Sequence, residues 1–208
     1  MPRSKEELAQ LIQREGSTDP RIVEAFRRVD RADFVPDDMR HEAYRDRPVV
    51  IPEKQTTSQP SLIARMIDAV SPKPGDRALE VGSGFGFQTA LLAALVTDVV
   101  SIEAHGSLVE ASRRNLQRAG ITNAQVVQGD GWLGYPEGAP FDVIVVSAAA
   151  TSLPGPLGDQ LADAGRLVVP LRERASDDVY LFEKKDDLLV RVRLITPARF
   201  VPLVPGPQ

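Results

Sequence analysis

The sequence contains no cysteine and only two histidines, His41 and His105, among 208 residues. The absence of cysteine excludes disulfides, a thiol nucleophile, and zinc or iron–sulfur sites with thiolate ligands. The two histidines lie far apart in the sequence and outside any H-E-x-x-H spacing, so no histidine metal site is predicted. We expect both to be surface or rim residues, and a catalytic triad that depends on histidine has little support.

The sequence also lacks a long hydrophobic run and a basic block. No stretch approaches the roughly 18 apolar residues that a membrane span requires, and the N-terminal residues lead into an amphipathic segment. Lys and Arg number 25 against 29 Asp and Glu, and these charges are spread along the chain. Since nucleic-acid-binding domains usually carry a basic patch, we predict no nucleic-acid and no membrane partner. We expect a cytoplasmic monomer.

The composition is that of an ordinary globular protein, with 42% hydrophobic and 26% charged residues. The length suits a single domain over residues 1–208. Apolar residues at helical spacing predict two short amphipathic helices between residues 5 and 30, with a break at residues 16–20. Residues 34–52 show no clear periodicity and predict an irregular connection. The segment 1–50 is therefore expected to pack as a helical unit on the remaining chain.

Short apolar runs recur between helical stretches after residue 75. They cover residues 78–81, 99–102, 124–127, 143–146 and 167–169. This alternation predicts an α/β fold with a Rossmann-like, doubly wound, mostly parallel sheet over residues 76–208. Before it, Pro60 opens a predicted helix that stops before Ser71. After it, residues 179–182 and 188–194 flank a charged turn and predict a C-terminal antiparallel hairpin.

The most informative motif, residues 79–90, is a predicted strand that runs into a glycine-rich turn and then a helix. Glycine allows a tight turn close to a ligand, with the helix N-terminus facing it. The match to G-x-G-x-x-G is incomplete because Phe87 occupies the third glycine position. Glu103 ends the next strand and suits a ribose diol, and Asp130 follows the third strand, where an adenine edge would lie. Each residue also has an interpretation without a ligand. The glycines would serve only turn geometry, Glu103 would be a solvated strand end, and Asp130 would belong to a plain Asp-Gly turn.

The order of Glu80, the two glycines, Glu103 and Asp130 resembles S-adenosylmethionine-dependent methyltransferases of the Rossmann-like class. Further motifs make the resemblance closer than this class. Residues 34–36, 43–48, 55–60, 80–90, 129–132, 148–150 and 199–203 together resemble bacterial protein-L-isoaspartate O-methyltransferases. The resemblance spans nearly the whole chain.

This resemblance implies an enzyme that methylates the free carboxylate of L-isoaspartyl, and more weakly D-aspartyl, residues in damaged proteins and peptides, and that releases S-adenosylhomocysteine. It implies that Ser58 is the active-site serine, in a loop over residues 55–60. It assigns substrate contacts to Thr56, Thr57, Ser58, Gln59, Val201, Pro202 and Leu203. It assigns cofactor contacts to Gln55, Thr56, Glu80, Gly82, Ser83, Gly84, Gln88, Glu103, Ala104, Asp130 and Gly131. No metal is implied.

The residue chemistry agrees with this implication. A substrate carboxylate with a pKa of about 4 is ionised at neutral pH, so its attack on a methyl group needs no general base. A neutral hydroxyl such as that of Ser58 can hold one carboxylate oxygen without competing for the methyl group. From the residues alone, Ser58 before Pro60 is more simply a helix N-cap. Pro52, Glu53 and Lys54 stand where the family usually has a glycine-containing approach to the loop.

Three other functions stay open. A relative of this family that methylates a specific aspartate of a ribosomally synthesised peptide would share the chemistry but would tend to carry extra substrate-binding segments. A non-catalytic module that retains S-adenosylmethionine or a nucleotide would not need the Ser58 loop. A nicotinamide oxidoreductase is disfavoured because Phe87 breaks the glycine motif and no proton-relay residue is evident.

Overall fold

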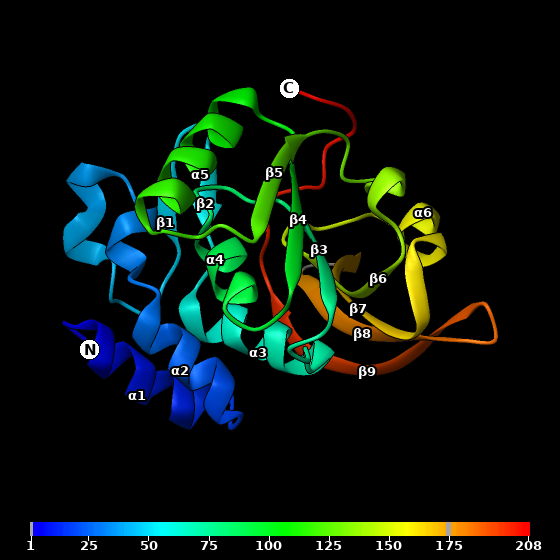
Figure 1. Ribbon diagram of the computed structural model, residues 1–208, viewed down its shortest axis with the longest axis horizontal. Coiled ribbons are helices and arrows are strands. Elements are labelled where there is room, and N and C mark those ends of the chain that lie inside the picture. Colours follow the sequence, from blue (N-terminus) through cyan, green and yellow to red (C-terminus); the bar gives the residue numbers. More distant parts are fainter. Residues whose placement is uncertain (1, 174–175) are drawn as a thin grey trace.

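The computed structural model describes residues 2–173 and 176–208, and a seven-stranded sheet runs through it (Figure 1). Its strand order is β5-β4-β3-β6-β7-β8-β9. The strands are β3 (Arg77–Val81), β4 (Asp98–Glu103), β5 (Ala124–Gln128), β6 (Phe141–Val146), β7 (Leu161–Glu173), β8 (Ser176–Lys185) and β9 (Leu188–Ala198). Strands β3 to β7 are mutually parallel, and β8 runs antiparallel to both of its neighbours. The predicted fold class and C-terminal hairpin are confirmed.

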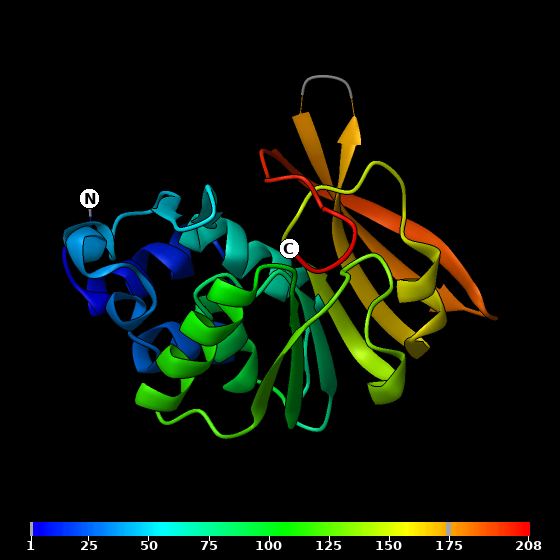
Figure 2. The same cartoon turned by 90° about the horizontal axis from the view of Figure 1, so that it is seen from above.

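The two faces of the sheet are covered differently (Figure 2). Helices α3 (Pro60–Val70), α4 (Phe87–Ala93) and α5 (Gly106–Arg118) pack on one face, with α1 (Lys5–Glu15) and α2 (Pro20–Arg28) outside them. The other face carries the short helix α6 (Gly155–Asp159) and the loops around Trp132 and Leu203. Parallel strands that are buried on both faces consist of continuous apolar residues. The apolar runs in the sequence therefore predicted where these strands lie.

The first two helices begin at side-chain N-caps. Ser4 Oγ accepts a hydrogen bond from Glu7 N at the start of α1, and the Asp19 side chain accepts one from Arg21 N at the start of α2. Pro20 occupies the first turn of α2, where its missing N–H costs nothing. The two predicted helices and the helix from Pro60 are confirmed.

The expected irregular connection contains more structure than predicted. It holds two 3₁₀ helices (Arg31–Phe34 and Asp37–Glu42), and strand β1 (Val49–Ile51) pairs antiparallel with β2 (Gln55–Thr57). Three-residue strands are too short for periodicity to reveal, so the sequence missed this hairpin. Strands β7 and β9 also run further than their apolar runs, because each pairs along its length with β8. Among the described residues, no helix combines the length and apolar character needed to cross a membrane.

Candidate active site

The loop after β3 brings backbone close to the carboxyl edge of the sheet. Gly82, Gly84 and Gly86 have φ of +95°, +53° and +92°, a region that side-chain-bearing residues rarely adopt. A Cβ at Gly86 would also lie 2.7 Å from Ser112 Oγ. Gly82 lies between β4 and β6, since its N–H donates to the Ile102 carbonyl and its Cα faces Ser147. The sheet order reverses at β3, the point where open α/β sheets bind ligands.

A cavity of about 830 Å³ opens above this loop. Its walls come from the glycine loop, the end of β4, the β2 segment and the C-terminal segment. The lining residues predicted as cofactor contacts are Gln55, Thr56, Gly82, Ser83, Gly84, Gln88, Glu103, Ala104 and Gly131. Apolar side chains, among them Ile102 and Leu108, complete the walls. Apolar walls combined with polar side chains and exposed backbone suit a small organic ligand.

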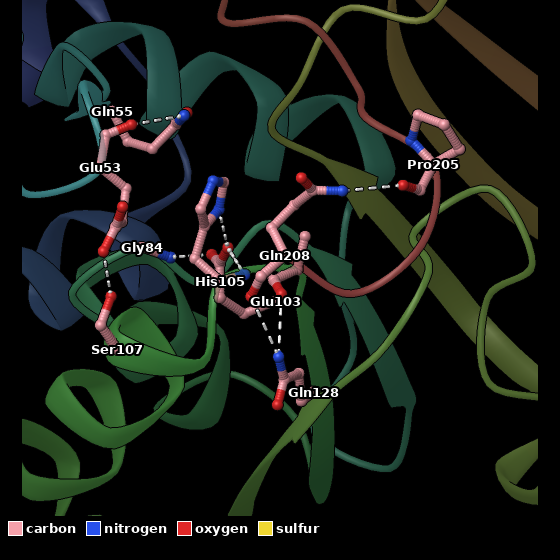
Figure 3. Close-up of polar contacts among 10 residues, drawn as sticks. Glu53, Gln55, Gly84, Glu103, His105, Ser107, Gln128, Pro205 and Gln208 are labelled. Atoms are coloured by element: carbon pink, nitrogen blue, oxygen red, sulfur yellow. Dashed lines mark hydrogen bonds and ion pairs between the residues drawn. The ribbon is translucent and has the colours of Figure 1, made fainter.

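Glu103 is the acceptor that faces this cavity (Figure 3). Its Oε2 accepts from Gly84 N at 2.9 Å, and its Oε1 accepts from His105 N at 3.1 Å. His105 Nδ1 lies 3.2 Å from the same Oε1. Oε2 has one hydrogen-bond donor and keeps acceptor capacity, so the Glu103 carboxylate is a fixed acceptor in the wall of the cavity.

The Ser83 hydroxyl is a second ligand-facing group. Ser83 is 6% exposed, lines the cavity, and its Oγ has no hydrogen-bond partner within residues 2–173 and 176–208. A buried hydroxyl without a partner costs free energy unless a ligand or water satisfies it. The glycine loop therefore offers a ligand the Ser83 hydroxyl as well as a backbone that the ligand can approach closely.

Glu80 does not line the cavity, although it was predicted to contact the cofactor. It is fully buried under the glycine loop. Its Oε2 accepts from Thr89 Oγ1 and from Ser101 Oγ, each at 2.5 Å, and its Oε1 accepts from Gln88 Nε2 at 3.0 Å. Its place in the site is thus to orient Gln88, whose side chain does reach the cavity.

Glu80 should make stability depend on pH. Burial raises its pKa from 4.5 to about 7, against three hydrogen-bond donors that favour the ionised form. Between these pH values the folded state holds a proton that the unfolded state has lost, so stability falls as pH rises. We expect the free energy of unfolding to drop by about 3 kcal/mol across this window from Glu80 alone. Urea unfolding of the wild type and Glu80→Gln at several pH values measures the effect, and parallel curves for the two proteins would contradict it.

Asp130, also predicted to contact the cofactor, does not line the first cavity. Its Oδ1 accepts from Trp132 N at 2.8 Å, the geometry of a plain Asp-Gly turn, and only the neighbouring Gly131 lines the cavity. Trp132 in turn donates from Nε1 to the Leu203 carbonyl at 3.2 Å. The aspartate therefore shapes the turn that positions Gly131 and the C-terminal segment.

A second cavity, of about 960 Å³, adjoins the first. Four residues line both cavities: Thr56, Ser58, Ser147 and Val201. Gln59, predicted as a substrate contact, lines the second cavity, while Thr57, Pro202 and Leu203 line the first. Of the seven predicted substrate residues, Thr56, Ser58 and Val201 thus lie at the boundary between the two cavities.

The Ser58 hydroxyl is available at this boundary. The N-cap of α3 is Gln59, so the simple helix-cap interpretation of Ser58 is wrong. An N–H group in the first turn of α3 is instead capped by a residue distant in the sequence, because Asp46 Oδ1 accepts a hydrogen bond from Ser61 N at 2.8 Å. Ser58 Oγ has no hydrogen-bond partner in the described part of the chain, whereas the Ser58 carbonyl is held by Arg31 at 3.1 Å.

The turn between β1 and β2 lies beside the start of α5 and directly precedes Gln55, which lines the first cavity (Figure 3). Glu53 and Lys54 have φ of 59° and 57°, the left-handed conformation that glycine adopts without strain. Ser107 Oγ donates to Glu53 Oε1 at 2.7 Å, and Gln55 Nε2 donates to the Glu53 carbonyl at 3.1 Å. The backbone thus keeps a glycine-like shape here, and side chains tie it to the start of α5.

The C-terminal segment, residues 201–203, also contributes to the walls where the two cavities meet. Ala149 N donates to the Val201 carbonyl, and Leu203 N donates to the Ala149 carbonyl, both at 2.8 Å. These bonds fix Val201 beside the end of β6.

Sequence reasoning did not assign several residues that line the cavities, among them His105 and Ser147. His105 lines the first cavity and contacts Glu103, and Ser147 lines both cavities directly after β6. Ser147 carried a usable signal, since a polar residue at the carboxyl end of a central parallel strand lies where ligands bind.

Comparisons with known proteins agree with this geometry. The profile of the family described as protein-L-isoaspartate(D-aspartate) O-methyltransferase (PCMT) matches residues 3–208. The chain is 44% identical to the protein-L-isoaspartate O-methyltransferase of Methanoregula boonei over 91% of this chain and 87% of the relative. It is 44% identical to that of Anaeromyxobacter dehalogenans over 95% of each chain.

Two solved structures are similar over nearly the whole fold. One protein-L-isoaspartate O-methyltransferase has a TM-score of 0.86 at 32% identity, covering 96% of this chain and 65% of that longer chain. A second, assigned as a beta-aspartate methyltransferase from Plasmodium falciparum and solved with S-adenosyl-L-homocysteine, has a TM-score of 0.84 at 28% identity, covering 98% and 99%.

Proposed function

The chain belongs to the protein-L-isoaspartate(D-aspartate) O-methyltransferase family, and we propose that this family's reaction takes place where the two adjoining cavities meet. The protein is a repair enzyme that transfers a methyl group from S-adenosylmethionine to the free carboxylate of L-isoaspartyl and D-aspartyl residues in damaged proteins and peptides. The meeting of both cavities at Ser58 is the observation that carries the proposal. When bound, S-adenosylmethionine supplies a methyl group attached to a sulfonium sulfur. Transfer of this methyl to a carboxylate oxygen leaves the sulfur as the neutral thioether of S-adenosylhomocysteine.

The residues of the first cavity fit this cofactor. The Glu103 carboxylate would accept hydrogen bonds from a ribose diol, and the partnerless Ser83 hydroxyl would face a polar group of the ligand. Gly82, Gly84 and Gly131 line this cavity without a side chain, and at Gly131 a Cβ would overlap Val81. The apolar side chains in the wall, among them Ile102 and Leu108, would reduce the water around the bound cofactor, which favours bringing an anion to a cation.

The second cavity would receive the isoaspartyl peptide. The substrate carboxylate is ionised at neutral pH, so the site needs to orient it rather than deprotonate it. Ser58 would hold one carboxylate oxygen, and the backbone of residues 201–203 would lie along the peptide. We also propose, from the sequence, that the chain forms one domain and acts as a cytoplasmic monomer.

Replacing Ser58 by alanine tests the proposal. We expect kcat/KM for an isoaspartyl peptide to fall about 10-fold to 100-fold, because a hydrogen bond to a charged group is lost at the reacting centre. The measurement is transfer of labelled methyl to a peptide pair that differs only in one aspartyl or isoaspartyl linkage, with S-adenosylmethionine binding measured alongside. Labelling of neither peptide by the wild type, with the cofactor still bound, would contradict repair and favour a dedicated peptide substrate or a binding module.

A further inference from the structure

Ser147 occupies a fixed place between the two cavities. It directly follows β6, and its N–H donates to the Val81 carbonyl at the end of β3 with a length of 2.8 Å. Its backbone is therefore held by the two central strands, and its side chain lines both cavities. A side chain mounted on the ends of rigid strands is positioned more accurately than one on a free loop.

Hydrogen bonding also fixes the polarity of the Ser147 hydroxyl. Gln88 Nε2 donates to Ser147 Oγ at 2.7 Å and to Glu80 Oε1 at 3.0 Å. The Gln88 amide therefore presents its nitrogen, with two N–H groups, to both neighbours. Ser147 Oγ is thus an acceptor toward Gln88, which leaves the O–H hydrogen to donate elsewhere. Within the part of the chain that the structure covers, Ser147 Oγ donates to no other group.

We propose that the Ser147 hydroxyl donates a hydrogen bond to the substrate carboxylate, so that this carboxylate is held by two hydroxyls, Ser58 and Ser147. The inference rests on the proposed function and adds a substrate contact to it. A carboxylate placed where the two cavities meet has two oxygens, and a donor on each wall fixes both its position and its rotation. Each oxygen has two lone pairs, so the attacking oxygen keeps one for the methyl group.

The chemistry predicts where the loss should appear. The carboxylate is fully charged before reaction and loses negative charge as it gains the methyl group. A hydrogen bond from Ser147 is therefore at least as strong in the bound substrate as in the transition state. Removing such an interaction raises KM and leaves kcat nearly unchanged.

The test compares Ser147→Ala, Ser147→Thr and the control Ser152→Ala, with an isoaspartyl peptide as the substrate. Ser152 is exposed and lines neither cavity, so it reports any general effect of a Ser→Ala change nearby. We expect Ser147→Ala to raise KM for the peptide about 10-fold to 100-fold with kcat within about threefold of wild type. Ser147→Thr retains the hydroxyl and should restore most of the affinity.

The dissociation constant for S-adenosylmethionine, measured by calorimetry on the same proteins, separates the remaining outcomes. An unchanged constant in Ser147→Ala together with the raised KM supports the proposal. A weakened constant with an unchanged peptide KM would assign the hydroxyl to the cofactor and overturn it, as would wild-type kinetics in Ser147→Ala. Inactivity of the wild type toward the isoaspartyl peptide would instead refute the proposed function itself.

Discussion

Replacing Glu103 by alanine is expected to weaken S-adenosylmethionine binding by about 100-fold or more, with the fold retained. Glu103 is 6% exposed, its carboxylate is held by Gly84 N and His105 N, and the residue lines the cavity. A charged acceptor that binds two hydroxyls contributes about 1.5–3 kcal/mol per hydrogen bond. The alanine variant loses both bonds, and the Gly84 N–H loses its partner. Calorimetry with S-adenosylmethionine and S-adenosylhomocysteine measures the loss.

Glu103→Gln is the matched control for this experiment. It keeps the shape and one acceptor oxygen but loses the charge and the second acceptor, so an intermediate affinity is expected. Circular dichroism and thermal unfolding check that both variants remain folded. An alanine variant that binds the cofactor within threefold of wild type would show that Glu103 serves only the backbone of the glycine loop.

Replacing Arg31 by methionine is expected to lower the free energy of unfolding by about 3–5 kcal/mol. Arg31 is 1% exposed, and its guanidinium donates to the carbonyls of Ala43, Arg45, Arg47 and Ser58 and to Thr57 Oγ1. Its centre also lies 5.7 Å from the Phe87 ring. Burial lowers its pKa to about 10, so the group stays charged at neutral pH. Methionine fills similar space but leaves these oxygens without a donor.

Arg31 also ties the active-site loop to the N-terminal segment, so its loss should impair catalysis. The methionine variant is expected to lose methyl transfer even at a temperature where it remains folded. Arg28→Ala is the control, because Arg28 forms only an exposed ion pair with Glu24 and should change stability by less than about 0.5 kcal/mol. Urea unfolding of both variants gives the comparison. A loss below about 1 kcal/mol in Arg31→Met would mean that water replaces the guanidinium without penalty.

Local patterns were enough to predict the fold. The apolar runs of β3, β4 and β6 are visible because parallel strands are buried on both faces. The glycine loop and Glu103 were found because strand order and chain order coincide there, so that consecutive βα turns meet at one edge. Helix starts at Pro20 and Pro60 were found because a proline in the first turn is a local signal.

Long-range contacts decided the rest. Glu80 and Asp130 share the motif pattern with Glu103, yet only the packed structure shows that the first is saturated by Gln88, Thr89 and Ser101 and that the second closes its own turn. The role of Arg31 depends on partners up to 27 positions away in the sequence.

The sequence by itself therefore determined the class of sheet and the edge where the glycine loop and Glu103 meet, because both depend on neighbouring residues. The loop that carries Ser58 was expected from the family resemblance, since the residues alone favoured a helix cap. Only the tertiary structure decided which polar side chains point into the cavities. Hydrogen bonds between distant segments direct each side chain, as the bonds of Ser147 to β3 and α4 show, and no periodicity in the chain encodes them.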